Sequence, residues 1–387
     1  MYIKKPILVI GVIVLILTTV FLTIGAVNPF GFTAFRDLLH FQYVSRVIMD
    51  TYYEDISPNS YMQYALEGMA NGTEDPYTTY LWGEKALEYK EKIHGNYKGI
   101  GVRVICNVED DTIEVVSVVP GSPAESAEIA AGDKILKVDG EAFTGLQLDE
   151  AVSKIRGAGD TEVLLTILKK KSGDTVEISL KRQEFDINVV SGRMLQNDIG
   201  MIKIEEFTDD SATKFKEKYD ELKNNGMKKL ILDLRNNPGG LLDEAVDIAD
   251  IFLEEGNVVV YTLDRDENKK EYFASGTKEE IPLVILTNNG SASASEVVTG
   301  CLKDYGIAYH IGEKTYGKGV VQGVFETGGE TLLSVTVSRY YTPNGTCIHK
   351  TGIVPDLEVS LPEMQNSNNL SAEEDAQLQA AIQYLRR

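Results

Sequence analysis

Three serines alternate with two alanines at residues 291–295, and an acidic residue follows at once, giving "SASASE". The preceding "IPLVILTNNG" predicts a buried strand that ends in a tight turn. Ser293 and Glu296 stand three apart before an apolar run, which is the spacing of a capping box at a helix start. A bare cap is the ordinary role of such a serine. A hydroxyl there also lies beside unpaired N–H groups that can stabilise an oxyanion, so Ser293 is a candidate nucleophile.

A nucleophilic serine needs a base. The chain has four histidines, and none stands in a context that pairs it with an aspartate: His40, His94, His310 and His349. Lys318 instead lies between two glycines in "YGKGVVQ", and burial that lowered its pKa from about 10.4 toward neutrality would make it a general base. Gln322 follows four residues later and could hold the amine by a hydrogen bond. A solvated lysine in a glycine loop is the alternative.

The same loop also matches a phosphate-binding pattern, because residues 312–318 have the form G-x-x-x-x-G-K. The next residue is Gly319, where a magnesium-binding Ser or Thr would be required. The residues that follow, "VVQGVFETGGETLLSVTVSRYY", predict strands and not the required helix. We therefore expect no nucleotide.

A third segment, "DLRNNPGGLLDEAV", predicts a buried strand, a tight turn through Pro238, Gly239 and Gly240, and then a helix. Two glycines at such a turn leave backbone amides free to face a substrate. An ordinary strand-to-helix turn would have the same residues.

Composition limits the classes of function. The 387 residues carry a formal charge of −21, which argues against a nucleic-acid surface. The three cysteines, Cys106, Cys301 and Cys347, have no zinc spacing and are expected to be buried free thiols. We expect no metal and no other cofactor.

Residues 6–27 form an apolar run after Lys4 and Lys5, and no charge follows until Arg36. The run is long enough to cross about 30 Å of hydrocarbon, and the lysines favour a cytoplasmic N-terminus of residues 1–5 with the remainder outside. A cleaved signal peptide is the alternative, although its apolar region usually has only about 7–15 residues. We expect a single-pass anchor in the cell membrane.

The rest of the chain changes pattern three times. Residues 33–96 predict helices that pack on a neighbour or pair between subunits, so a homodimer is an expectation. Residues 97–183 predict short alternating strands in a compact unit, and residues 184–361 alternate strands and helices around a largely parallel sheet. Residues 362–387 predict a polar linker and a terminal helix.

Together, and in this order, "DLRNNPGG", "SASASE", "YGKGVVQ" and "YYTPNGTCIHKTGIVPD" closely resemble the carboxyl-terminal processing peptidases, or tail-specific proteases. The resemblance covers roughly residues 35–387 and includes "DPYTTYL" and a PDZ-like unit with "YKGIGV" and "SPAESAEIAAGDKILKVDG". It implies a multi-domain α+β fold with a helical N-terminal region, a PDZ domain and a layered α/β protease domain of the crotonase or ClpP kind.

The resemblance also implies roles for individual residues. The nucleophile is the middle serine, Ser293, rather than Ser291 or Ser295, with Lys318 as general base and Gln322 in support. The oxyanion hole uses the backbone N–H of Ala294 and of either Gly239 or Gly240. In the PDZ domain, the backbone of Gly99, Ile100, Gly101 and Val102 captures the C-terminus of a substrate, and Arg156 relays peptide binding to the protease.

The implied function is that of a membrane-anchored serine endopeptidase that acts on proteins or peptides with accessible C-termini. Two alternatives remain open. One is a membrane-anchored PDZ scaffold with an inactive peptidase domain. The other is an acyl-CoA-type enzyme, because the layered fold is shared with crotonases.

Overall fold

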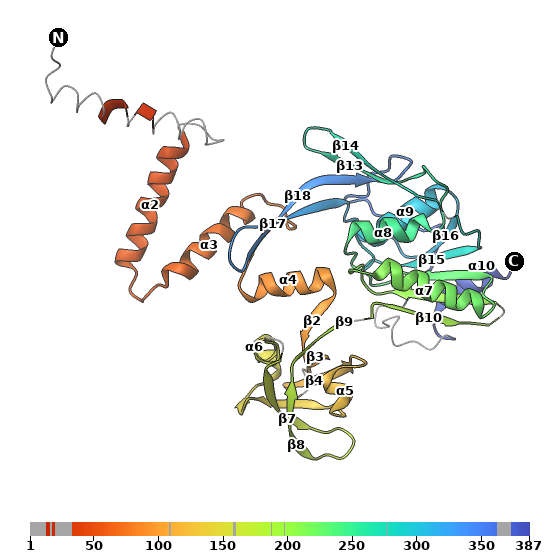
Figure 1. The fold of residues 1–387 in the computed structure, drawn as a ribbon, viewed down its shortest axis with the longest axis horizontal. Coiled ribbons are helices and arrows are strands. Elements are labelled where there is room, and N and C mark those ends of the chain that lie inside the picture. Colours follow the sequence, from red (N-terminus) through yellow and green to blue (C-terminus); the bar gives the residue numbers. More distant parts are fainter. Residues whose placement is uncertain are drawn as a thin grey trace, which may run out of the picture. The chain divides into compact units, whose positions relative to one another are not determined.

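The computed structural model describes residues 13–15, 18–19, 33–107, 110–157, 160–186, 188–196, 198–276, 278–361 and 373–387. The chain divides into two units, Met1–Met69 and Ala70–Arg387. Helices α2 (Thr33–Thr51) and α3 (Pro58–Asn71) confirm the two helices predicted first (Figure 1). The expected anchor, residues 6–27, lies outside the described residues except for 13–15 and 18–19. Within the described residues, no helix combines the length and apolar character that a membrane crossing requires.

A six-stranded sheet forms the centre of the second unit. Its strands, in spatial order, are β10 (Val190–Met194), β11 (Ile199–Ile204), β12 (Lys229–Asp233), β15 (Leu283–Thr287), β16 (Ala308–Gly312) and β19 (Leu357–Glu358). Only the edge strand β10 is antiparallel to its neighbour. The largely parallel sheet that the alternating pattern predicted is therefore confirmed.

Helices cover both faces of this sheet. Alternate residues of a strand face opposite sides, so Leu230 and Leu232 of β12 enter one core and Ile231 the other. The first core is completed by α7 (Ser211–Asn224), α8 (Leu242–Asp250) and α9 (Ala294–Asp304). The second is completed by the C-terminal helix α10 (Ala376–Leu385), which confirms the predicted terminal helix and places it against the sheet.

A second sheet is antiparallel, and local sequence patterns did not predict it. Its order is β1 (Thr79–Trp82), β18 (Thr331–Tyr341), β13 (Val258–Asp264) and β14 (Lys269–Phe273), and β17 (Val320–Glu326) also pairs with β18. The expected helical region of residues 33–96 is thus interrupted by the strand β1 before α4 begins. This strand forms by pairing with β18, far along the chain, and its own four residues carry too short a pattern to reveal it.

A separate core lies in the strands of the predicted PDZ-like unit. Its sheet has the order β3 (Val102–Asn107), β4 (Thr112–Val118), β5 (Lys134–Val138), β7 (Glu162–Leu168) and β8 (Thr175–Lys181), with β6 (Glu141–Ala142) beside β5. Two short helices are α5 (Pro123–Ser126) and α6 (Leu148–Ile155), and a 3-10 turn is η1 (Gly145–Gln147). The antiparallel strand pair β2 (Asn96–Gly99) and β9 (Gln183–Asp186) connects this unit to the rest of the protein. Strand β2 enters the unit just after α4 (Glu84–His94), and β9 leaves it after β8.

All three cysteines are free thiols, as expected. Only Cys301 is buried, because α9 packs into the first core, whereas Cys106 and Cys347 are half-buried. The expectation of buried thiols is therefore correct for one of the three.

Candidate active site

Ser293 stands where the C-terminal end of β15 passes into α9, as the strand–turn–helix pattern predicted. Its backbone is unusual, with φ +55° and ψ −115°, whereas an N-cap residue normally has β-region angles. A non-glycine residue held at such angles costs on the order of 1–3 kcal/mol, and residues of this kind cluster at functional sites. Glu296 Oε2 accepts a hydrogen bond from the Ser293 N–H at 2.9 Å, which is one half of the predicted capping box.

The neighbouring serines are committed to structure. Ser291 Oγ donates to Leu234 O at 2.8 Å, and Ser295 Oγ donates to Asn237 O at 3.0 Å. Both serines are fully buried, whereas Ser293 is only half-buried. Of the three hydroxyls, that of Ser293 is therefore the one placed to meet a substrate.

The two glycines of the "NPGG" turn face different neighbours. A Cβ added to Gly239 would lie 2.6 Å from Ser293 Cβ and 2.9 Å from Ala294 N, whereas one added to Gly240 would lie 2.0 Å from Phe207 O. Both glycines have positive φ, +103° and +140°. Gly239 is therefore the residue that lies against the candidate nucleophile, and no side chain fits in either place.

Asn237, whose importance the sequence did not reveal, holds this turn to the serine segment. Its Oδ1 accepts a bond from the Gly239 N–H at 2.9 Å, and its Nδ2 donates to Ile204 O at 2.9 Å. Its own carbonyl accepts bonds from Ala292 N and Ser295 Oγ, both at 3.0 Å. The Gly239 N–H would therefore have to share or release its bond to Asn237 to reach an oxyanion, while Ala294 N is the first amide of α9.

Glu296 joins the serine to the lysine loop, which capping alone did not predict. Its Oε2 accepts bonds from the N–H groups of Ser293 and Lys318, both at 2.9 Å. Its Oε1 accepts bonds from Thr315 Oγ1 at 2.6 Å and Gly317 N at 2.8 Å. Burial raises the pKa of this carboxyl, while the four hydrogen bonds lower it. One buried side chain thus sets the distance between the two segments.

Lys318 lies beside an aromatic ring from the "DPYTTYL" segment. Its Nζ is 4.9 Å from the centre of the Tyr77 ring. A turn fixes this tyrosine, because Asp75 accepts bonds from Tyr77 N at 3.2 Å and Thr78 Oγ1 at 2.7 Å. Burial, followed by a hydrogen bond with Tyr316, raises the pKa of Tyr77 to about 12. The amine of the candidate base thus lies over the face of a firmly held ring.

Tyr340 of β18 provides a further link across the site. Its hydroxyl donates to Lys318 O and is hydrogen-bonded to the Ser293 side chain. Burial raises the pKa of this phenol, which therefore remains a neutral donor.

Gln322 is carried by β17 at an irregularity in its pairing with β18. Its Nε2 donates to Thr336 Oγ1 at 3.3 Å, and Thr336 N in turn donates to Thr78 Oγ1 at 3.1 Å. The bond predicted between Gln322 and the Lys318 amine stays a prediction.

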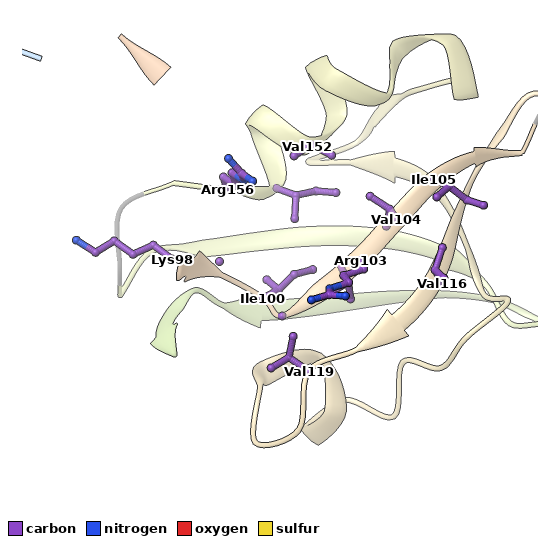
Figure 2. Close-up of a pocket in the computed structure, with 13 residues that line it drawn as sticks. Lys98, Ile100, Arg103, Val104, Ile105, Val116, Val119, Val152 and Arg156 are labelled. Atoms are coloured by element: carbon purple, nitrogen blue, oxygen red, sulfur yellow. The ribbon is translucent and has the colours of Figure 1, made fainter. Parts of the chain in front are cut away.

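The predicted carboxylate-binding loop lines a groove of about 520 Å³ in the PDZ-like unit (Figure 2). Besides residues 98–102, the lining consists mainly of aliphatic side chains: Val104, Ile105, Val116, Val119, Val152 and Ile155. Arg156 also lines the groove, and its Nη1 donates to Glu88 Oε1 of α4 at 2.5 Å. The arginine thus contacts a helix outside the PDZ-like unit, which is compatible with the relay role expected of it.

Among the residues that the structure describes, no group of three or more His, Cys, Asp or Glu side chains is arranged to hold a metal ion.

Comparisons with known proteins give independent information. The sequence profile of peptidase family S41 matches residues 198–359, and a PDZ domain profile matches residues 114–169. A Staphylococcus aureus protein named "Probable CtpA-like serine protease" is 37% identical over 346 residues, which cover 88% of this chain and 68% of that protein. A Staphylococcus epidermidis protein of the same name is 36% identical over 335 residues, covering 86% and 67%. This chain thus spans about two thirds of the length of these relatives.

The fold is also shared with a solved structure. A Bacteroides fragilis structure assigned to the S41 proteases is 19% identical, with a TM-score of 0.53 over 87% of this chain and 91% of that one. The fold, the site and the matches define a serine peptidase that carries a PDZ domain. Within that class the chain belongs to peptidase family S41, and its relatives are of the CtpA-like kind.

Proposed function

We propose that the chain is a membrane-anchored endopeptidase that cleaves protein substrates near their C-termini, with Ser293 as nucleophile and Lys318 as general base. The observation that carries the proposal is the conformation of Ser293. A serine that only caps a helix has no need of a positive φ, yet Ser293 has φ +55° and lies against Gly239. The same residue is connected to the loop of Lys318 through the carboxylate of Glu296.

These contacts support the following reaction. As Ser293 Oγ bonds to the carbonyl carbon of the scissile peptide, its proton passes to the neutral amine of Lys318. The oxyanion that forms is stabilised by the N–H of Ala294 and by that of Gly239, once Asn237 releases or shares it. Lys318 then protonates the leaving amine as the C–N bond breaks. Water attacks the acyl-enzyme by the same steps, and Ser293 recovers its proton.

Substrate capture belongs to the PDZ groove. The N–H groups of Gly99–Val102 bind the terminal carboxylate, and the aliphatic lining of the groove accepts the last side chains of the substrate. The chain upstream of the captured end then lies in the site of Ser293. Arg156, which contacts both the groove and α4, connects this capture to the protease.

The anchor and the oligomer complete the proposal. The apolar run of residues 6–27 behind Lys4 and Lys5 supports a single-pass anchor in the cell membrane, with the catalytic unit outside the cytoplasm. Helix α2 carries many exposed apolar side chains, among them Leu38, Phe41 and Val47, which supports pairing between two copies of the chain.

The test is substitution of the two reacting residues. Ser293→Ala and Lys318→Ala should each reduce peptide cleavage by at least about 10³-fold, with the melting temperature and circular dichroism close to wild type. Cleavage of a substrate that ends in an aliphatic residue, followed by mass spectrometry, measures the loss. Retention of wild-type turnover in either folded variant would reject the assignment.

Two further measurements separate the alternatives. A serine-reactive phosphonate probe should label Ser293 in the wild-type chain, whereas an inactive PDZ scaffold would remain unlabelled. Parallel assays with a peptide and with an acyl-CoA thioester distinguish a peptidase from a crotonase-type enzyme.

A further inference from the structure

A close contact joins the end of α4 to the segment that follows β11. This segment is in turn hydrogen-bonded to the "NPGG" turn. Gly95 is the C-cap of α4, with φ +67°. A Cβ built on Gly95 would lie 2.8 Å from Thr208 Cβ, 2.9 Å from its Oγ1 and 3.2 Å from its Cγ2. Threonine is branched at Cβ and cannot turn all three atoms away. Only glycine therefore allows α4 to end at this distance from Thr208.

Thr208 is held in this place by its shape. It is 1% exposed, and its Oγ1 has no hydrogen-bond partner among the residues that the structure describes. A buried hydroxyl without a partner costs about 1–3 kcal/mol. The side chain thus contributes packing here and no polar contact.

Phe207, the residue before Thr208, is hydrogen-bonded to the "NPGG" turn on both sides. Phe207 N donates to Gly239 O at 2.9 Å, and Leu241 N donates to Phe207 O at 2.8 Å. The Cα of Gly240 is pressed against the same carbonyl, since a Cβ there would lie 2.0 Å from Phe207 O. A shift of Thr208 therefore displaces Phe207 and, with it, the two glycines beside Ser293.

The other side of the contact is fixed as well. His94 Nδ1 lies 2.8 Å from Asp209 Oδ2, so the last residue of α4 and its C-cap meet two consecutive residues after β11. Lys90 of the same helix is paired with Glu326 of β17 at 2.5 Å. The strand β2, which leads into the PDZ-like unit, begins at the next residue after Gly95. The end of α4 is therefore a firm support for Thr208.

We propose that Thr208, packed against Gly95, is a positioning residue for peptide-bond cleavage that acts through Phe207 to place the Gly239–Gly240 turn beside Ser293. This proposal rests on the proposed function, because that function gives the turn its role in the oxyanion hole. The contact acts on the step in which negative charge develops, so its loss lowers kcat more than it raises KM.

The experiment compares two glycines that bound the same helix. Gly83 precedes α4 with φ +60° and ψ −136°, which strains an alanine more than the left-handed conformation of Gly95 with ψ 9°. A Cβ at Gly83 would meet nothing within 4 Å, so Gly83→Ala carries at least as much backbone strain without the collision. In the full-length chain in detergent, Gly95→Ala should lower kcat at least about tenfold relative to Gly83→Ala, with KM changed less than about twofold. Equal kcat in the two variants would overturn the proposal.

Variants at Thr208 provide a second test that does not depend on how well Gly95→Ala folds. Thr208→Gly removes all three contacting atoms and should also lower kcat, whereas Thr208→Val keeps the branched shape and should recover most of that loss. If Thr208→Val is as slow as Thr208→Gly, the shape of the side chain is not what positions the turn. Combining Gly95→Ala with Thr208→Gly removes the collision and should give a smaller loss than the sum of the two.

Failure of this proposal is distinguishable from failure of the proposed function. If wild-type cleavage does not depend on Ser293, the function itself is wrong. If it does depend on Ser293 and Gly95→Ala behaves like Gly83→Ala, only the role of Thr208 is wrong.

Discussion

At the scale of single residues, Glu296 connects the two reacting segments. Its carboxylate acts only as an acceptor in its four hydrogen bonds. Glu296→Gln replaces one acceptor oxygen by an NH₂ group that faces these donors. We expect kcat to fall by about 10–100-fold with little change in KM, since the PDZ groove is untouched. Single-turnover cleavage measures the effect.

Glu244 offers the matched control, because its carboxylate also accepts bonds at a helix start, from Asp210 N, Ser211 Oγ and Ala212 N. Glu244→Gln should lower stability and leave turnover near wild type. Equal turnover in the two Gln variants would show that Glu296 has no special part in catalysis.

The sequence predicted the local half of this arrangement. The three-residue spacing of Ser293 and Glu296 indicated the helix start, because a capping box is a short-range pattern. The bonds from Glu296 to Thr315, Gly317 and Lys318 cross from a helix to a separate loop, and no spacing rule reports such a contact. The role of Asn237 was not predicted either, because its contacts to Ile204 and Ser295 are also between distant segments. An Asn before Pro-Gly-Gly is common in any turn and gives no further signal.

At the scale of elements, a buried ion-pair group joins the strand before the "NPGG" turn to the C-terminal helix. Arg235 donates to both oxygens of Asp233, at 2.9 and 2.7 Å, and to Asp375 Oδ1 at 2.9 Å. Asp375 also caps α10 by accepting a bond from Leu378 N at 3.0 Å. Desolvation works against the charged arginine, but the two carboxylates outweigh it and raise the pKa of Arg235.

Asp375→Asn should therefore destabilise the protein by about 1–3 kcal/mol, because it removes one of the two carboxylates around the buried Arg235, while Asp233 stays in place and asparagine can still cap α10. Urea unfolding measures this free energy. Asp160→Asn is the control, because Asp160 and Lys181 form an exposed pair at 2.7 Å, of a kind worth at most about 1 kcal/mol. A loss at Asp375 no larger than that at Asp160 would contradict the expectation.

Elements with long apolar runs were predictable, and those that depend on distant pairing were not. The runs of β12 and β15 indicated buried parallel strands, because such strands are apolar on both faces. Strand β13 looked alike in the sequence, yet it pairs with β18 in the antiparallel sheet. Strand order is decided by contacts between segments far apart, which a local pattern does not contain.

At the scale of the whole molecule, stability should depend on pH through a buried histidine. His310 lies in β16, and Thr287 Oγ1 is 2.5 Å from its Nε2. Burial, and then the charge of Lys303, lowers its pKa to about 4, although Asp356 opposes this. Its unfolded value is about 6.5, so the unfolded chain binds the extra proton between pH 6.5 and 4 while the folded chain does not.

Acidification across that window therefore lowers the free energy of unfolding by up to about 3 kcal/mol at about 1.4 kcal/mol per pH unit, and stability returns as pH rises above 6.5. His349, whose pKa is also lowered by burial, contributes in the same direction. Melting temperatures at pH 7.5 and 5.0 measure the loss, and His310→Gln should make it smaller. An unchanged pH dependence in this variant would assign the effect to other groups.

The order of elements along the chain has a consequence for synthesis. The ribosome completes β12, the "NPGG" turn and Ser293 before it reaches α10, although α10 covers the reverse face of the same sheet. Until those last helical residues emerge, Leu286 and Ile311 stay uncovered and Arg235 lacks Asp375. The support beneath the "NPGG" turn is therefore incomplete until α10 has been synthesised.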